Sequence, residues 1–268
     1  MLPILFESGP IVVYTHDVFT ALGLLVGLAV YYRALRRDRI LDRRIVLISV
    51  AALIGGGVGA RLITAWEHLP YYANLADAPL TFAISHSGKS IIGGLAGGYR
   101  AIAVTKRVLR YDLSTGDYYA AAIPLALAIG RVGCFLSELP LGTSTNLPWG
   151  MTVSPDAAAA FVRCPGCDGP MHPSMLYEIG FHLAALAAVL RYRRFVVVRG
   201  DTLKLYLLSY AVFRFAVEFV RGNEIRFAGL TGPQLVLVPL TALLVAHFIR
   251  QWRSGAYRMP SPEPAFAP

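Results

Sequence analysis

The sequence predicts an all-α integral membrane protein with about seven transmembrane helices. Of its 268 residues, 56% are hydrophobic and only 15% are charged, a composition that is rare in soluble domains. A membrane-spanning helix needs roughly 20 apolar residues. Seven apolar runs approach this length, at about 12–32, 45–66, 90–104, 118–136, 174–190, 203–220 and 230–249.

The basic residues indicate how these helices are oriented. The net charge is +9, and most Lys and Arg lie in alternate connections and near the C-terminus, around 33–44, 106–110, 191–199 and 250–258. This positive-inside pattern predicts an N-terminus outside the cell and a C-terminus in the cytoplasm. It accounts for the basic charge without nucleic acid, so no nucleic-acid partner is expected.

Residues 1–259 are expected to form a single transmembrane domain. The longest outward connection, 137–173, is rich in Pro, Gly, Ser and Thr and predicts a small extracytoplasmic head between the fourth and fifth helices. Residues 260–268 are proline-rich and are predicted to be a disordered cytoplasmic tail. The first residues lack the basic segment of a signal peptide, so the first helix is expected to direct insertion.

Cysteine usage leaves three interpretations of the head open. Cys164 and Cys167 form a Cys-x-x-Cys pair in a segment expected to face an oxidising compartment. A disulfide, two free thiols, or a metal site with His172 would each fit this pattern. The candidate ligands fall short of a closed structural zinc site, so no metal ion is expected.

Three arginines lie within or at the end of apolar runs, namely Arg61, Arg131 and Arg214. A charge at such a depth costs about 3 kcal/mol on insertion scales, and it usually faces a protein interior or a wet cavity. The planar guanidinium group binds phosphate or carboxylate with two hydrogen bonds. Membrane lipids surround these helices, and a phospholipid headgroup is the most abundant such anion there. The arginines therefore predict a site for this headgroup.

The sixth run carries further charges at helical spacing. Arg214, Glu218 and Arg221 follow the i, i+4, i+7 pattern, which predicts that all three lie on one face of a helix. One interpretation is a charge ladder that neutralises itself. The other is that Glu218 holds one arginine while another receives an anion.

The fourth run ends in Gly130-Arg-Val-Gly133, with Glu138 just beyond it at the expected outer interface. Glycines flanking an arginine allow a backbone or a ligand to approach closely. Helix packing alone explains the two glycines but leaves Arg131 unexplained.

The fifth run opens with His172, and Tyr177 and Glu178 are expected to face inward one turn deeper. A single histidine is more often structural than catalytic. Here it is expected to converge with Arg131 and Glu138 on the outer face, which favours a functional role.

These motifs together resemble those of the bacterial prolipoprotein diacylglyceryl transferase family. The resemblance extends over about 10–252, with matching order, spacing and topology. It rests on Gly130-Arg-Val-Gly133, Leu147-Pro-Trp-Gly-Met151, His172-Pro-Ser-Met-Leu-Tyr-Glu178 and Phe213-Arg-x-x-x-Glu-Phe-x-Arg221.

The resemblance implies transfer of a diacylglyceryl group from phosphatidylglycerol to the lipobox cysteine in the signal-peptide region of a prolipoprotein, with release of glycerol 1-phosphate. It implies action among the membrane lipids at the outer leaflet of the bacterial cytoplasmic (inner) membrane, without a metal or organic cofactor.

The resemblance also implies roles for individual residues. Arg131 and Arg214 would hold the headgroup, with Arg221 and Glu218 in a supporting network. Tyr210 lies one turn before Arg214, and Arg61 matches a basic position of the family's second span.

The chain departs from the family's pattern at three places. Ile92 stands where members usually carry a histidine, Cys134 replaces an asparagine, and Val13-Tyr-Thr-His-Asp17 stands where the family has an aromatic residue and a glycine. Lys89 could compensate for the missing histidine.

Another group must then accept the proton of the acceptor thiol. The candidates are His172, His16 and Glu218, and a histidine ranks first because its pKa lies near neutral pH. His172 has the better expected location, whereas His16 could form a buried pair with Asp17.

Two other functions remain open. The first is a phospholipid-dependent transferase with a different acceptor, and the second is a non-catalytic lipid-binding or transport protein. Transporters usually place their site at the midplane between internal repeats. The chain shows no obvious repeat, and its polar residues gather toward the outer face, which argues against transport.

Overall fold

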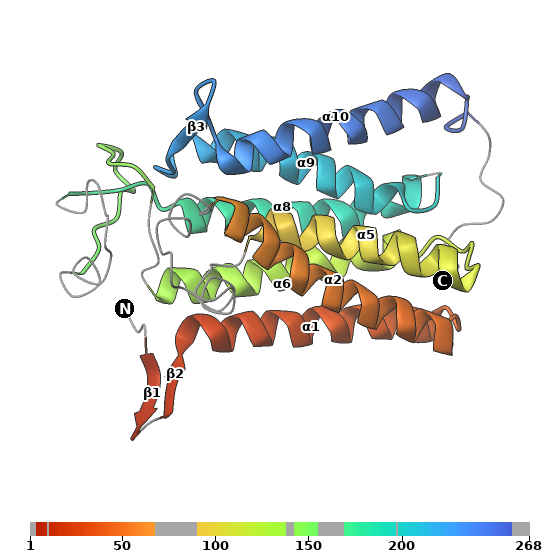
Figure 1. The fold of residues 1–268 in the computed structure, drawn as a ribbon, viewed down its shortest axis with the longest axis horizontal. Coiled ribbons are helices and arrows are strands. Elements are labelled where there is room, and N and C mark those ends of the chain that lie inside the picture. Colours follow the sequence, from red (N-terminus) through yellow and green to blue (C-terminus); the bar gives the residue numbers. More distant parts are fainter. Residues whose placement is uncertain are drawn as a thin grey trace. The chain divides into compact units, whose positions relative to one another are not determined.

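The computed structural model describes residues 4–9, 11–67, 90–137, 142–154, 169–196 and 198–258. This part of the chain is dominated by α-helices (Figure 1), which confirms the predicted fold class. The helices are α1 (Thr15–Arg37), α2 (Arg43–Glu67), α5 (Ile91–Leu109), α6 (Gly116–Leu136), α8 (Ser174–Tyr192), α9 (Asp201–Glu218) and α10 (Gly232–Arg253), with the short 3-10 helix η1 (Arg193–Phe195). Five of them, α1, α2, α6, α8 and α10, are long and apolar enough to cross a membrane.

Two short antiparallel hairpins accompany the helices. The strand β1 (Ile4–Ser8) pairs with β2 (Ile11–Tyr14), and β3 (Ile225–Phe227) pairs with β4 (Leu230–Thr231). The first hairpin corrects the expected start of the first apolar run, because residues 12–14 are a strand and α1 begins only at Thr15. β-Branched valines favour the extended backbone.

The third apolar run forms a longer helix than its composition predicts. The expected run ends at residue 104, whereas α5 continues to Leu109. Ser90 caps its first turn, since its hydroxyl accepts a hydrogen bond from Gly93 N at 3.3 Å. At the other end, Lys106 Nζ donates to Leu113 O at 2.7 Å, which satisfies this basic side chain just beyond the helix.

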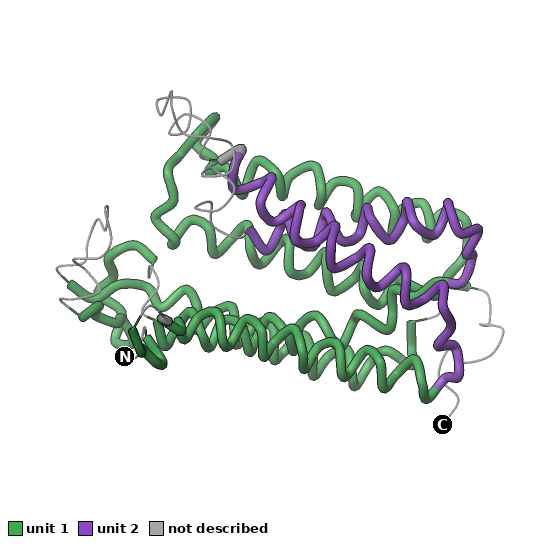
Figure 2. Tube along the Cα trace, turned by 60° about the horizontal axis from the view of Figure 1, so that its bottom comes forward, with its two compact units in different colours: residues 1–37, 114–268 green, residues 38–113 purple. Residues whose placement is uncertain are grey.

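The chain forms two compact units, 1–37 with 114–268 and 38–113 (Figure 2). The single transmembrane domain predicted over 1–259 stays a prediction. The smaller unit is the pair of helices α2 and α5. Glycines bring their backbones together: a Cβ added at Gly97 would lie 2.2 Å from Gly55 O, and one added at Gly59 would lie 2.4 Å from Gly93 O. Small residues at such crossings allow close helix packing within a membrane.

This packing predicts that Gly97→Ala destabilises the protein, because the new methyl group would overlap the backbone of α2. Overpacking of this kind costs about 1–3 kcal/mol, so the midpoint of thermal unfolding in detergent should fall by several degrees. Gly57→Ala is the matched control, since an added Cβ there meets nothing within 4 Å. Equal midpoints for the two variants would contradict the packing argument.

In the larger unit, α1 packs lengthwise on α6. A Cβ added at Gly23 would lie 2.5 Å from Ala126 O, and one at Gly27 would lie 3.0 Å from Ala126 Cβ. The contact continues to the end of α6, where a Cβ at Gly133 would lie 2.5 Å from Phe19 Cβ. The first turn of α1 and the last turn of α6 are therefore held against each other.

The start of α9 carries a buried polar cluster around Asp201. Its carboxylate accepts hydrogen bonds from Lys204 Nζ at 2.8 Å and Tyr257 OH at 2.7 Å, and it lies 2.9 Å from His247 Nε2. Burial alone would raise the pKa of Asp201, but the hydrogen bonds from Lys204, Tyr257 and His247 lower it overall. The cluster ties α9 to α10 and to the turn that follows α10.

We expect Asp201→Asn to lower the free energy of unfolding by about 2 kcal/mol, the usual size for a lost hydrogen bond to a charged group. Because the folded-state pKa of Asp201 is depressed, its contribution is present above the unfolded-state pKa of about 3.9 and is lost as pH falls below it. The difference from wild type should therefore shrink in acid. Glu224→Gln is the control, since the 3.4 Å pair of Glu224 with Arg226 is exposed. A difference that persists unchanged in acid would contradict this origin.

Candidate active site

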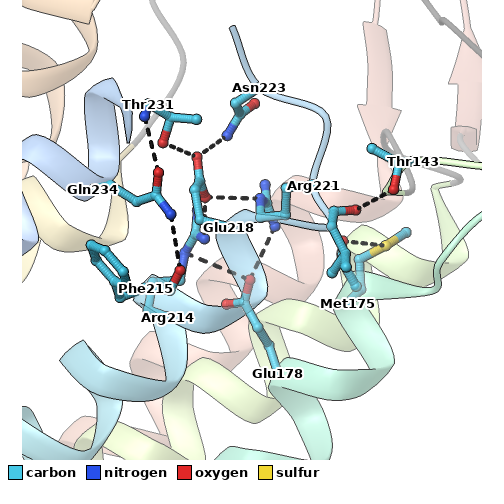
Figure 3. A network of polar contacts seen from close by, with 12 residues as sticks. Thr143, Met175, Glu178, Arg214, Phe215, Glu218, Arg221, Asn223, Thr231 and Gln234 are labelled. Carbon is cyan, nitrogen blue, oxygen red and sulfur yellow. Dashed lines mark hydrogen bonds and ion pairs between the residues drawn. The ribbon is translucent and has the colours of Figure 1, made fainter. Parts of the chain in front are cut away.

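The site is built around Glu178, in the second turn of α8, whose side chain is 0% exposed. Arg131, near the end of α6, contacts Glu178 Oε2 with Nη2 at 2.7 Å and Nε at 2.8 Å. Arg221 Nη1 lies 3.0 Å and Arg214 Nε 4.0 Å from Glu178 Oε1. Three arginines from different parts of the chain thus converge on one carboxylate, and Figure 3 shows two of them beside it.

A second buried carboxylate, Glu218, completes the cluster at the last residue of α9. Arg214 Nη1 forms an ion pair with Glu218 Oε2. The other oxygen of Glu218 accepts a hydrogen bond from Thr231 Oγ1 at 2.9 Å and one from Asn223 Nδ2. Both oxygens of Glu218 are therefore held by neighbouring side chains, whose contacts Figure 3 shows.

The start of α10 fixes Thr231 in turn. Thr231 and Gln234 form a capping box, in which Gln234 Oε1 accepts from Thr231 N at 3.0 Å. Gln234 Nε2 donates to Phe215 O at 3.2 Å. The first turn of α10 is thereby attached to the last turns of α9, which holds Glu218 in place.

The charges of this cluster do not balance. Among the described residues, three guanidinium groups face two carboxylates, which leaves one positive charge uncompensated there. The carboxylates are fully buried, whereas the side chains of Arg131, Arg214 and Arg221 are 13%, 7% and 21% exposed. The three arginine side chains are therefore somewhat more accessible than the two carboxylates.

Arg221 also keeps an unused hydrogen-bond donor. Within the described residues its Nε is buried without a hydrogen-bond partner, and its nearest ion-pair contact is Glu218 Oε2 at 3.8 Å. A buried donor left unsatisfied is unfavourable. An anion bound beside Arg221 would satisfy it.

The prediction that Arg214, Glu218 and Arg221 lie on one face of a single helix is wrong. Arg221 does not continue α9, because the helix ends at Glu218 and the chain enters a turn in which Gly222 has a φ of +69°. The segment around Thr143 holds this turn, since Thr143 N donates to Val220 O at 2.7 Å. Arg221 reaches the cluster from this turn and not from the helix.

Tyr210, on α9, is buried, and its hydroxyl lies 3.4 Å from Glu178 Oε2. One turn away, Tyr206 OH is hydrogen-bonded to His182 Nδ1 at 3.1 Å. Polar contacts therefore continue along the boundary between α8 and α9.

His172 and Tyr177 belong to a group of polar contacts at the start of α8. Tyr177 OH accepts a hydrogen bond from Trp149 Nε1 at 2.9 Å and lies 3.1 Å from His172 Nδ1. The backbone of His172 is paired with the segment 142–143, since His172 N donates to Thr143 O at 2.9 Å and Gly142 N donates to His172 O at 2.7 Å. A Cβ at position 142 would lie 2.0 Å from Val220 O, so only glycine fits there.

His16 lies in the first turn of α1, close to the end of α6, since a Cβ added at Gly133 would lie 3.4 Å from His16 Cα. Its Nδ1 is 3.3 Å from Asp17 Oδ1. Next to Gly133 on α6, Cys134 Sγ lies 3.7 Å from Arg131 Nη1.

The remaining predicted site residues flank Arg131, lie in the smaller unit, or lie outside the described residues. An added Cβ at Gly130 meets nothing within 4 Å, whereas Gly133 packs against α1. Arg61 is half-buried on α2 and Ile92 is buried on α5, both in the smaller unit. Glu138, Cys164, Cys167, Lys89 and the tail 260–268 lie outside the described residues.

Sequence reasoning missed the central position of Glu178. It named Tyr177 as a site residue, while Glu178 was expected only to face inward. An ionisable residue inside an apolar run is itself a signal of function. Thr231 and Asn223 gave no such signal, because their role depends on how the chain turns after α9.

Comparison with known proteins identifies the family. Residues 3–250 match the family model described as prolipoprotein diacylglyceryl transferase. The chain is 32% identical to a phosphatidylglycerol–prolipoprotein diacylglyceryl transferase of Cereibacter sphaeroides, with 87% of this chain and 88% of the relative covered. It is 28% identical to the protein of the same name from Pseudomonas putida, over 98% of this chain and 97% of the relative.

The chain belongs to the prolipoprotein diacylglyceryl transferase family. Within this family it is a divergent member, since its identity to the relatives compared is about a third or less. The buried arginine cluster is formed by residues of the motifs that carry the resemblance, including Arg131, Glu178, Arg214 and Arg221.

The geometry predicts that Glu178→Gln destabilises this family member by about 3 kcal/mol or more, because three buried or partly buried guanidinium groups would face a single carboxylate. Inorganic phosphate should raise the unfolding midpoint of this variant more than that of wild type, since it supplies the missing negative charge. Thermal unfolding in detergent, with Glu224→Gln as the exposed control, measures both effects. A midpoint equal to that of the control would show that Glu178 does not organise the arginines.

Proposed function

We propose that this protein transfers a diacylglyceryl group from phosphatidylglycerol to the lipobox cysteine of prolipoproteins, a step of lipoprotein biogenesis. Membership of the family and the names of the relatives support this function. The observation that carries it is the cluster of Arg131, Arg214 and Arg221 on two buried carboxylates, with one positive charge left over.

The charge of the cluster suits the donor lipid. The phosphodiester of phosphatidylglycerol carries one negative charge, which would neutralise the excess charge of the arginines. Arg131 and Arg214 would hold the phosphate, and Arg221 would supply its unused Nε donor. Glu178 and Glu218 would orient the guanidinium groups and would not touch the lipid.

The same cluster favours the reaction as well as binding. The acceptor sulfur attacks the glycerol carbon that carries the phosphate oxygen, so a sulfur–carbon bond forms and a carbon–oxygen bond breaks. The electron pair of the broken bond goes to the oxygen, and glycerol 1-phosphate leaves with more negative charge than the diester had. Fixed arginines stabilise this developing charge more strongly than the charge of the bound lipid, which lowers the barrier.

The residues around the cluster have supporting roles in this proposal. Tyr210, whose hydroxyl contacts Glu178, would hold that carboxylate in place. Gly130 would leave room beside Arg131, whereas Gly133 would support the site by letting α1 pack against the end of α6. Tyr177 would line the entrance to the site, and the roles of Arg61 and Glu138 in substrate binding stay predictions. Phosphate departure on arginines and proton transfer to a side chain require no metal or organic cofactor.

We place the protein in the bacterial cytoplasmic (inner) membrane, with its N-terminus outside and its C-terminus in the cytoplasm. The arginine cluster lies at the end of α6 and beyond the end of α9, which corresponds to the outer leaflet in this orientation. The partners would be phosphatidylglycerol, other membrane lipids and the signal-peptide region of a prolipoprotein.

One observation favours a second candidate, a phospholipid-dependent transferase with another acceptor. Ile92 is buried on α5, at the position where the family usually has a histidine. An altered set of groups for the acceptor could accompany an altered acceptor, whereas the cluster proposed for the donor is complete.

The test is expression of the chain in a bacterium depleted of its own transferase, with mass spectrometry of a reporter lipoprotein. Wild type should add the diacylglyceryl thioether to the reporter cysteine. Arg214→Lys should lower the modification about 100-fold, because an ammonium group cannot reproduce the paired hydrogen bonds of the guanidinium group. Arg250→Lys, at the far end of α10, is the matched control and should remain active.

An unmodified reporter in cells that contain folded wild-type protein would reject the proposed acceptor. Modification of a different molecule, dependent on Arg214, would then favour the second candidate. Full activity of Arg214→Lys would reject the proposed donor site.

A further inference from the structure

The hairpin β3–β4 has a hydrogen-bond donor at each of its ends, and both donors bind the same oxygen of Glu218. Asn223 Nδ2, just before β3, and Thr231 Oγ1, at the end of β4, donate to Glu218 Oε1. Ile225 and Thr231 are opposite residues of the two strands. Pairing of the strands therefore brings the two ends of the hairpin together beside one carboxylate oxygen.

These two bonds fix a torsion that a glutamate otherwise leaves loose. The last side-chain torsion of Glu, which turns the carboxylate plane, has broad energy minima. Two donors on Oε1 hold this plane, and the plane sets the direction of Oε2. Glu218 Oε2 forms the ion pair with Arg214 Nη1. Because the guanidinium group is rigid and planar, a fixed Oε2 also orients the other donors of Arg214.

The hydroxyl of Thr231 is itself fixed as a donor. Thr231 is the N-cap of α10, and its side chain accepts a hydrogen bond from the backbone N–H of Gln234. The single proton of the hydroxyl is thus directed to Glu218 Oε1, at 2.9 Å. Thr231 and Glu218 are both buried, so water would not readily replace this donor.

We propose that Thr231 and Asn223 are positioning residues for the transfer reaction, which act on Arg214 through Glu218. The role rests on the proposed function, in which Arg214 holds the phosphate of the donor lipid. The two residues keep the guanidinium group in the direction in which it stabilises the leaving phosphate. The charge of this phosphate is larger in the transition state than in the bound lipid, so loss of either donor lowers kcat more than it changes KM.

A purely structural role of Thr231 predicts a different pattern. As an N-cap, Thr231 stabilises α10, and its loss lowers the free energy of unfolding whichever residue occupies position 214. Positioning requires the planar guanidinium group, because the ammonium group of lysine is a compact charge with rotatable donors. The two roles are therefore separated when the same substitution is made in wild type and in an Arg214→Lys background.

The experiment uses the purified full-length chain with phosphatidylglycerol in detergent micelles and a synthetic lipobox peptide with one cysteine. Mass spectrometry measures the thioether product. Thr231→Val keeps the shape of the side chain without its hydroxyl. It should lower kcat about 10-fold, less than the roughly 100-fold cost of a 1 Å misplacement at an active site, while KM for phosphatidylglycerol stays nearly constant. Thr231→Ser keeps the hydroxyl and should retain most of the wild-type kcat.

Further variants separate positioning from stability. Asn223→Leu removes the second donor without affecting the cap of α10 and should also lower kcat, by less than Thr231→Val. Glu224→Gln is the matched control beside it and should keep the wild-type rate, because the pair of Glu224 with Arg226 is exposed. In the Arg214→Lys background, Thr231→Val should cause little further loss. The midpoint of thermal unfolding of each variant reports the loss of the cap separately from kcat.

The outcomes distinguish this proposal from the proposed function. If wild type forms the thioether and both Thr231→Val and Asn223→Leu keep its kcat, the positioning role is rejected and the proposed function stands. An equal loss from Thr231→Val with Arg214 and with lysine at that position, or no recovery in Thr231→Ser, also rejects it. If Thr231→Val does not fold, Asn223→Leu in the same two backgrounds decides the question. If wild type forms no thioether, the proposed function fails and this role fails with it.

Discussion

The pairing of buried Glu178 with arginines is the interaction on which the rest of the site depends. An uncompensated carboxylate would be strongly unfavourable in a helix surrounded by lipid, and so would an uncompensated guanidinium group. Their pairing ties the end of α6 and the turn after α9 to the start of α8. Glu218 repeats the arrangement and attaches α10 through Thr231. The ends of four helices are therefore held by two carboxylates.

This arrangement also explains how the cluster can be stable and still bind an anion. The two carboxylates are fully buried, and they fix the direction of each guanidinium group before an anion arrives. Preorganised positive groups need little rearrangement when charge develops, which is the most effective form of electrostatic catalysis. One positive charge remains among the described residues of the cluster. A singly charged phosphate group would therefore suit the cluster, and the arginines would stabilise that group more strongly as it gains negative charge during the reaction.

The sequence predicted the parts of the molecule that depend on local pattern. Apolar runs predicted the helices to within a few residues at most ends, and Arg131 and Arg214 were recognised because charges inside such runs are rare. The turn at Gly222 was not predicted, since the i, i+4, i+7 spacing of Arg214, Glu218 and Arg221 fits a helix equally well. The strand at 12–14 was missed because its apolar residues also suit the start of a spanning helix.

Contacts between distant segments could not be predicted in the same way. The neighbours of Glu178 come from α6 and from the turn after α9, and no spacing within one segment reveals them. The position of His16 beside the end of α6 depends on how closely α1 packs against Gly133, which no local spacing reveals. His16 and Cys134 looked like isolated departures from the family's pattern, and only the fold brings the helices that carry them together.

The most direct test of this account is a structure of the protein in nanodiscs that contain phosphatidylglycerol. The account predicts density for one lipid phosphate in contact with Arg131, Arg214 and Arg221, while Glu178 and Glu218 stay buried behind them. A headgroup bound elsewhere, or an arginine cluster that remains closed on its carboxylates while lipid occupies another site, would contradict it.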